Sequence, residues 1–327
     1  MTVAVGVLVV ASSTALGLPH LSSSSARTNR TGVVVVNTTL ATGGVAAGTG
    51  IVLTSSGEVL TNNHVIRGAT SIRVTDTSTH RTYTATVAGY SVSKDIALLR
   101  LRNAHGLQTV LTGNSSDLRV GEGVTAVGNA GGTGVLTVKT GKVTGLARSI
   151  TVSDEDGSST RLTGLIQTSA PLRPGDSGGP LLENGRVVGI DAAASSSIRF
   201  PEDGEGFAIP INRAIAIARQ VEAGRTSASV HVGATAFLGV VLGGQDGFGQ
   251  SEGAVVENVA TGSPADRAGL GPNDVITSFG GKRVTSSTSL RSLVLRTSPG
   301  RTVRVTWIDP FAGTTSASVR LVSGPPQ

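Results

Sequence analysis

A serine enclosed by glycines after a proline is the feature that most constrains this chain. The stretch from Arg173 to Leu181 reads Arg-Pro-Gly-Asp-Ser-Gly-Gly-Pro-Leu. Glycines lack a Cβ, so the loop can adopt conformations closed to other residues and direct successive N–H groups at one point. Such a loop suits a nucleophile that meets a substrate carbonyl, with the N–H groups of Gly175 and Ser177 forming an oxyanion hole. Because a serine alone is a weak nucleophile, this interpretation requires a base and a group that orients the base.

Candidates for both groups lie upstream. His64 follows Thr-Asn-Asn after an apolar run, and Asp95 precedes another apolar, strand-like run. The order His, Asp, Ser is one of several chain orders that build the same triad. We therefore predict Ser177 as nucleophile, His64 as general base and then acid, and Asp95 as the orienting group. Alone, the histidine could be structural and Asp95 could pair with Lys94 or Arg100 at the surface, but three fragments in this order favour catalysis.

The composition favours β-structure. Aromatic residues make up only 3% of the 327 residues, so the core must be built from Val, Ile, Leu and Ala. The 45 glycines indicate short strands and tight turns, and the length indicates about two domains. The absence of cysteine excludes disulfides, thiol catalysis and cysteine-ligated zinc. The net charge of +6 includes no run of basic residues, so we expect no nucleic-acid partner, and we expect no metal or cofactor.

The serine, histidine and aspartate segments resemble those of chymotrypsin-fold serine proteases. With residues 206–210, which match a final barrel strand, and with the C-terminal part, the chain resembles the HtrA (Deg) family. The resemblance implies a mainly β fold, a chymotrypsin-like double β-barrel followed by a PDZ domain, which is a β-sandwich with two helices. It also implies a serine endopeptidase that hydrolyses unfolded or damaged extracytoplasmic proteins in bacterial protein quality control. The alternative is a conditionally inactive or chaperone-like protein that binds peptides through its PDZ domain.

The chain from Ala236 onward carries the resemblance to a PDZ domain of the bacterial HtrA type. It rests on the segments 236–240, 253–256, 263–270 and 272–276. PDZ domains add an extended C-terminal peptide to a sheet edge and hold its carboxylate with loop N–H groups. The resemblance assigns peptide binding to the loop residues Phe237, Leu238 and Gly239 and to the groove residues Val240, Leu290 and Val294. The alternative is a structural β-rich domain that packs on the protease.

The domain boundaries follow from these segments and from the N-terminal composition. We predict a signal peptide or membrane anchor at 1–20, a linker at 21–31, the protease domain at 32–222, a linker at 223–235 and the PDZ domain at 236–323. Residues 2–19 are uncharged, and their length suits a signal-peptide core or a borderline membrane span. They favour an extracytoplasmic location, either membrane-anchored or secreted. The family resemblance further implies protein substrates and C-terminal peptides as partners, and a homotrimer.

The substrate pocket is also inferred from the resemblance. In chymotrypsin-fold proteases its base lies six residues before the nucleophile, which is Pro171 here, and the wall segment contributes Ala192, Ala193 and Ala194. Proline cannot supply the negative charge that a trypsin-like preference for Arg or Lys requires. We therefore expect a modest apolar pocket for small or medium aliphatic side chains.

Two positions depart from the family pattern. Most HtrA proteins have Asn before the nucleophile, whereas this chain has Asp176. In digestive chymotrypsin-like enzymes that aspartate pairs with a new N-terminus released by cleavage, but no trypsin-like activation sequence is found near Gly32. We predict that Asp176 is an acceptor that stabilises the loop; the alternative is activation by cleavage. At Ala192 a hydroxyl near the triad aspartate is missing, which removes one hydrogen bond to Asp95, worth about 1 kcal/mol.

Overall fold

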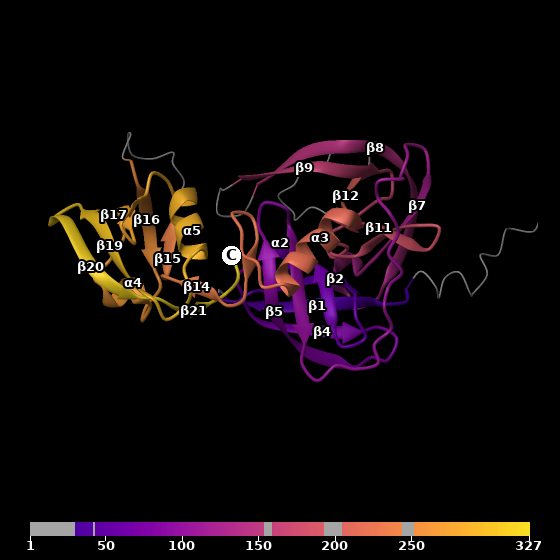
Figure 1. Ribbon diagram of the computed structural model, residues 1–327, viewed down its shortest axis with the longest axis horizontal. Coiled ribbons are helices and arrows are strands. Elements are labelled where there is room, and N and C mark those ends of the chain that lie inside the picture. The colour runs from indigo at the N-terminus through magenta and orange to yellow at the C-terminus, as the bar shows by residue number, and fades with distance from the viewer. Residues whose placement is uncertain (1–29, 42, 154–158, 193–204, 244–251) are drawn as a thin grey trace, which may run out of the picture.

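The computed structural model shows a pair of β-barrels with a smaller β-rich domain beside them (Figure 1). It describes residues 30–41, 43–153, 159–192, 205–243 and 252–327. The predicted signal peptide or anchor at 1–20 lies outside the described residues. Within the described ranges, no helix is long and apolar enough to cross a membrane.

The first barrel is an antiparallel sheet with the strand order β13-β5-β4-β1-β2-β3-β6, closed by a pairing of β5 with β6. Its elements are β1 (Val33–Leu40), β2 (Val45–Val52), β3 (Glu58–Thr61), α2 (Asn63–Ile66), β4 (Ala69–Asp76), β5 (Thr82–Ser91), β6 (Ile96–Leu101) and β13 (His231–Val232). The four consecutive valines of β1 are buried on both faces, because Val33 and Val35 join one core cluster and Val34 and Val36 join another. A strand that is buried on both faces requires apolar residues at consecutive positions rather than at alternate ones.

The second barrel is closed in the order β10-β11-β12-β9-β8-β7. Its elements are β7 (Gly123–Gly128), η1 (Ala130–Gly132), β8 (Thr137–Ser153), β9 (Ser159–Thr168), β10 (Pro180–Glu183), β11 (Arg186–Asp191) and β12 (Gly206–Pro210), followed by α3 (Ile211–Glu222). One core cluster joins Ile51 and Leu60 of the first barrel to Leu165 and Ile190 of the second. The two barrels therefore share a core, which fixes the loops between them.

The C-terminal domain builds its own core around a sheet in the order β15-β16-β17-β19-β20. Its elements are β14 (Thr235–Phe237), β15 (Val240–Leu242), β16 (Ala254–Val259), α4 (Pro264–Arg267), β17 (Val275–Phe279), β18 (Lys282–Arg283), α5 (Ser287–Leu295), β19 (Thr302–Asp309), β20 (Gly313–Arg320) and β21 (Val322–Gly324). Ser263 caps α4 by accepting from Asp266 N, with Pro264 at the first helical position. This domain and the two barrels confirm the predicted mainly β fold, a double barrel followed by a PDZ domain.

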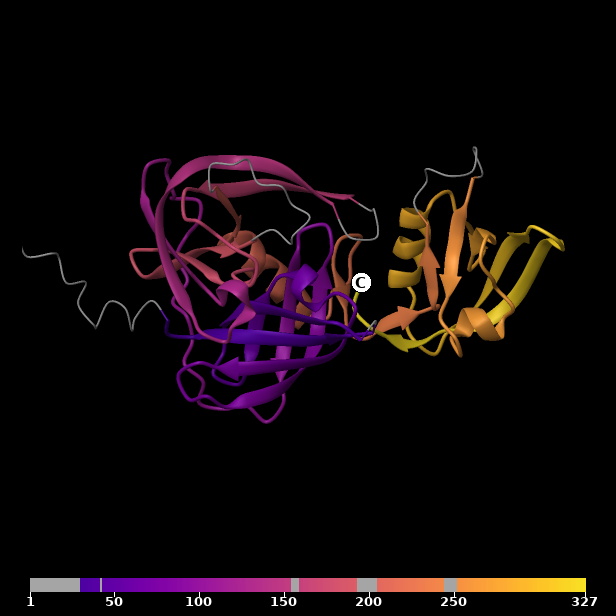
Figure 2. The ribbon, with the colours of Figure 1, turned by 180° about the vertical axis from the view of Figure 1, so that it is seen from behind.

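The two units meet where the chain passes from one to the other. β13 lies within the predicted linker 223–235 and pairs with β5, so part of this connection extends the first sheet. β14 then pairs with β21 at the junction (Figure 2). Tyr90 of β5 is fully buried there, and its hydroxyl lies 3.0 Å from Thr235 Oγ1 and accepts from Gln327 N at 3.2 Å.

Removing the Tyr90 hydroxyl should weaken this junction. We expect Tyr90→Phe to lower the free energy of unfolding by about 1–2 kcal/mol, because the buried Thr235 hydroxyl loses its partner. Tyr83→Phe is the matched control, since Tyr83 is a buried tyrosine of the same strand whose hydroxyl has no hydrogen bond among the described residues. Urea unfolding followed by circular dichroism measures both. Equal stability of the two variants would contradict the role given to the Tyr90 hydroxyl.

Candidate active site

Asp95 holds His64 at two points. Its Oδ1 accepts from His64 N at 2.9 Å, and its Oδ2 lies 2.8 Å from His64 Nδ1. The Asp95 side chain is 10% exposed and the His64 side chain 32% exposed, so the carboxylate lies behind a partly accessible ring. A neutral imidazole that donates from Nδ1 carries its lone pair on Nε2. The ring is thereby fixed in orientation and in the tautomer that a general base needs.

The positions of these two residues follow from the strands beside them. β3 ends at Thr61, three residues before His64, and β6 begins directly after Asp95. The two strands pair, with Thr61 opposite Ala97. Asp95 adopts a left-handed backbone conformation, with φ of 51°, and its carbonyl accepts from the buried Asn62 Nδ2 at 2.8 Å. Sequence reasoning did not identify Asn62, which fastens the turn before β6 to the end of β3.

Ser177 lies where the nucleophile loop, residues 173–179, meets the first barrel. Its carbonyl accepts from Thr49 N at 2.8 Å, and the residue is 4% exposed. The next residue, Gly178, has φ of +85°, and a Cβ there would overlap Thr49 O and Thr61 Oγ1. The loop therefore lies directly against the strand that leads into His64, and only a glycine after the serine permits this approach.

Thr49 ties the nucleophile loop to both barrels. Its hydroxyl donates to Gly175 O at 2.7 Å and accepts from Asn129 N at 2.9 Å, and the residue is fully buried. Gly175 has φ of +96°, and a Cβ there would overlap Asn129 O. Position 175 therefore accepts only glycine, in agreement with the role predicted for this loop.

The peptide groups around the serine are oriented by hydrogen bonds to their carbonyls. Pro174 O accepts from Gly131 N at 2.8 Å, and Asp176 O accepts from Gly179 N at 2.9 Å. In a trans peptide the N–H points opposite to the C=O. The N–H groups of the two following residues, which are those predicted for the oxyanion hole, are thus held in fixed directions.

Of the predicted substrate pocket, the structure describes two residues. Pro171 is exposed. Ala192 is buried in the core shared by the barrels, and its N–H donates to Phe207 O at 2.8 Å. Ala193 and Ala194 lie outside the described residues. The apolar pocket therefore stays a prediction.

Sequence reasoning assigned no role to Asp191, which is a buried acid beside the nucleophile loop. It ends β11, its carbonyl accepts from Gly178 N at 2.8 Å, and its side chain is fully buried. Neither carboxyl oxygen has a hydrogen-bond partner among the described residues. Burial, together with repulsion from Asp176, raises the pKa of Asp191 well above its usual value, and Lys139 opposes this only in part. The only signal in the sequence was an acid that ends a strongly apolar strand.

The predicted peptide-binding residues lie together in the C-terminal domain. Four of them share or contact its core, since Leu238, Leu290 and Val294 are buried in it and Val240 packs against it. Phe237 is half-buried on β14. Gly239 has φ of +91°, and a Cβ there would overlap the Ser263 side chain, so packing against α4 already demands a glycine. β15 is a terminal strand of its sheet, with an edge at which an added strand could pair.

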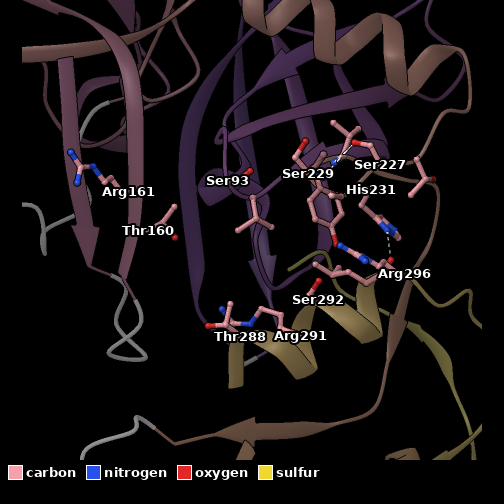
Figure 3. Close-up of a pocket in the computed structure, with 16 residues that line it drawn as sticks. Ser93, Thr160, Arg161, Ser227, Ser229, His231, Thr288, Arg291, Ser292 and Arg296 are labelled. Carbon is pink, nitrogen blue, oxygen red and sulfur yellow. Dashed lines mark hydrogen bonds between the residues drawn. The ribbon is translucent and has the colours of Figure 1, made fainter. Parts of the chain in front are cut away.

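A cavity of about 360 Å³ lies between the barrels and α5 (Figure 3). It is lined by the end of β5, by the connecting segment around His231, by Thr288 and Ser292 of α5 and by Arg296, which follows α5. None of the predicted site residues lines it. Nor do the described residues include a group of three or more His, Asp or Glu side chains that could hold a metal ion.

Comparisons with known proteins agree with the two units of the fold. Residues 48–190 match the family model of the trypsin-like peptidase domain, and residues 236–308 match that of the PDZ domain. The chain thus combines a trypsin-like peptidase domain with a PDZ domain. It is 35% identical over 277 residues to the serine protease Do-like HtrA of Lactococcus lactis subsp. lactis, covering 80% of this chain and 67% of that protein. The chain belongs to the HtrA family of serine proteases.

Other relatives extend the comparison. The chain is 34% identical over 294 residues to serine protease PepD of Mycobacterium tuberculosis, covering 84% of this chain and 60% of that protein. It is 37% identical over 267 residues to a probable periplasmic serine endoprotease DegP-like of Hahella chejuensis, covering 78% and 53%. The chain therefore spans only about half to two thirds of the length of these relatives. A solved structure of the HtrA-type protease AlgW with a tripeptide is 27% identical, covers 92% of this chain and 96% of that chain, and has a TM-score of 0.53.

The two hydrogen bonds of the Thr49 hydroxyl can be tested by Thr49→Val, which keeps the shape of the side chain and removes the hydroxyl. We expect amide hydrogen exchange in the nucleophile loop to accelerate at least about 10-fold and the free energy of unfolding to fall by about 1–3 kcal/mol, because two buried backbone groups lose their partner. Thr84→Val, at an exposed position of β5, is the control. Unchanged loop exchange in Thr49→Val would show that other contacts suffice to hold the loop.

Asp191→Asn tests the buried carboxyl through the pH dependence of stability. A pKa raised in the folded state means that the native protein binds the proton more tightly, so its stability falls as pH rises above about 4, the unfolded value. The amide does not ionise, so Asp191→Asn should be more stable than the wild type by about 1–3 kcal/mol near neutral pH. The difference should vanish near pH 4. Urea unfolding at several pH values, with the exposed Asp117→Asn as control, measures it; a difference independent of pH would contradict the account.

Proposed function

We propose that this protein is a serine endopeptidase that cleaves unfolded or damaged proteins outside the cytoplasm, with His64, Asp95 and Ser177 as its triad. The observation that carries the proposal is the double hydrogen bond of Asp95 to the backbone and ring of His64, at 2.9 and 2.8 Å. It fixes the orientation of the proposed base, and the peptide groups of the glycine-enclosed serine loop are themselves oriented by hydrogen bonds.

The proposed acylation uses these groups in turn. Ser177 Oγ attacks the substrate carbonyl carbon while its proton passes to His64 Nε2. The carbonyl oxygen becomes an oxyanion that accepts from the N–H groups of Gly175 and Ser177. Asp95 stabilises the imidazolium that has formed, without taking its proton. Collapse of the intermediate breaks the C–N bond, and the amine leaves with the proton from His64.

Deacylation repeats the same steps with water as the nucleophile. His64, now neutral, takes a proton from the water as it attacks the acyl carbon, and then returns the proton to Ser177 Oγ. The carboxylic acid product leaves and the free serine is restored. No group beyond the three side chains and the loop N–H groups is needed for this cycle.

The C-terminal domain would select substrates or regulatory peptides by their C-termini. The edge of β15 and the loop Phe237–Gly239 favour addition of an extended peptide, as in other PDZ domains. The apolar residues Val240, Leu290 and Val294 favour an apolar C-terminus. The solved structure of the related protease AlgW contains a tripeptide, which supports peptide binding by this chain.

Location and assembly are parts of the proposal that rest on relatives and on sequence. Several relatives are named periplasmic, including those of Hahella chejuensis and Haemophilus influenzae. They support an extracytoplasmic site of action, as does the uncharged apolar segment at 2–19. Membrane anchoring through residues 1–20 and assembly as a homotrimer, which the family resemblance implies, belong to the same hypothesis.

Covalent labelling tests the triad. A fluorophosphonate probe should add one phosphonyl group to Ser177, with loss of fluoride, and the adduct should be absent in Ser177→Ala. Asp95→Asn should slow labelling roughly 10³- to 10⁴-fold, because the amide disfavours the required tautomer. Intact mass spectrometry follows the adduct, and Ser149→Ala, at an exposed serine of β8, is the control.

Two outcomes would separate the proposal from its rivals. An unlabelled wild type, even with peptides of apolar C-terminus present, would favour the conditionally inactive or chaperone-like peptide-binding protein. If labelling succeeds, a screen of C-terminal peptides decides between a quality-control protease and a dedicated processing protease. Broad apolar preference would support quality control, whereas one sharp motif would indicate a dedicated processing protease.

A further inference from the structure

An ion pair holds a residue of the nucleophile loop that is not part of the triad. The ammonium of Lys139 on β8 pairs with Asp176 Oδ2, and the side chains are 13% and 1% exposed. The same carboxylate oxygen accepts from Arg173 N at 2.8 Å. Asp176 directly precedes Ser177, so the pair connects the loop to the wall of the second barrel.

The surroundings of Asp176 make a cation there necessary. A carboxylate with this burial is strongly destabilised unless it is paired. Its Oδ1 has no hydrogen-bond partner among the described residues. β7 faces it with Gly128, where a Cβ would come within 2.6 Å of Oδ1, and β11 contributes a second acid, Asp191. Lys139 on β8 is therefore the group that compensates the charge.

The position of Asp176 controls the peptide groups on both sides of it. The Asp176 carbonyl belongs to the same peptide group as the Ser177 N–H. The Asp176 N–H donates to Arg173 O at 3.0 Å and belongs to the same peptide group as the Gly175 carbonyl. Glycines flank this segment and leave other backbone conformations accessible. Displacement of the Asp176 side chain would therefore allow these peptides to rotate out of the oriented arrangement.

We propose that Lys139 is a positioning residue for the nucleophile loop. Its ammonium holds Asp176 where a digestive chymotrypsin-like enzyme uses a cleaved N-terminus, so the adjoining Ser177 N–H of the proposed oxyanion hole is set without proteolytic activation. The inference rests on the proposed protease function for its role in catalysis. It also accounts for an aspartate at a position where the family pattern has asparagine.

The test compares labelling rates of full-length variants with the fluorophosphonate probe. Lys139→Met keeps the length of the side chain and removes the charge, and should slow labelling about 10- to 100-fold, because the oxyanion-hole donors lose their orientation. Lys139→Arg should stay within about threefold of the wild type. The double variant Lys139→Met, Asp176→Asn removes both charges and should recover most of the loss, which a role in packing alone would not produce. Lys142→Met, at an exposed lysine of the same strand, is the control.

A second readout does not depend on catalysis. In a Ser177→Ala background, hydrogen exchange of the loop amides should accelerate in Lys139→Met and return in the double variant. Loop exchange and labelling unaffected by Lys139→Met would overturn the inference while leaving the protease function intact. An unlabelled wild type would overturn the protease function, and exchange alone would then decide whether Lys139 orders the loop. Faster labelling after removal of an added N-terminal extension would also overturn the role proposed for Lys139, because a free N-terminus would then be the partner of Asp176.

Discussion

The contact between Thr49 and the nucleophile loop is the constraint on which the site depends. Thr49 N donates to Ser177 O, and its hydroxyl joins Gly175 O to Asn129 N. Its own carbonyl accepts from Thr61 Oγ1 at 2.7 Å, at the end of the strand that leads to the histidine. One buried residue of the first barrel thus connects the loop, the second barrel and the base. Small errors in its position would be transmitted to each of them, since cores are close-packed.

Glycines at the barrel interface make this contact physically possible. A Cβ on Gly48 would overlap the Val65 side chain and lie 3.2 Å from Ser177 O. A Cβ on Gly178 would overlap Thr49 O. Any side chain at these points would push the loop from the first barrel. The glycine-rich motif therefore has a predicted function, which is exposure of N–H groups, and a second function, which is close approach of two backbones. The PDZ loop repeats the second function, since Gly239 packs against Ser263.

The sequence was sufficient to predict the fold and the pairing of Asp95 with His64, but not the contacts that support this pair and the nucleophile loop. His64 and Asp95 could be predicted because each adjoins the end of an apolar strand, and short-range pattern locates strand ends. Thr49 and Gly175 are 126 residues apart, and Lys139 and Asp176 are 37 apart. No local periodicity distinguishes a threonine or lysine that reaches a distant loop from one that faces solvent. The burial of Asp191 could not be predicted for the same reason, because it depends on barrel closure.

The charges around the loop explain why these distant partners belong together. An aspartate at 176 without a cation would be a buried unpaired charge, and a lysine at 139 without the aspartate would bring an ammonium to a largely buried position. Each residue is costly alone and acceptable only with the other, so an aspartate at 176 requires a cation at the position of Lys139. Asp191 adds a second acid to this region, and its raised pKa favours the neutral form. Lys139 and Asp176 balance each other's charge, so the loop is held by a directional bond between two opposite charges.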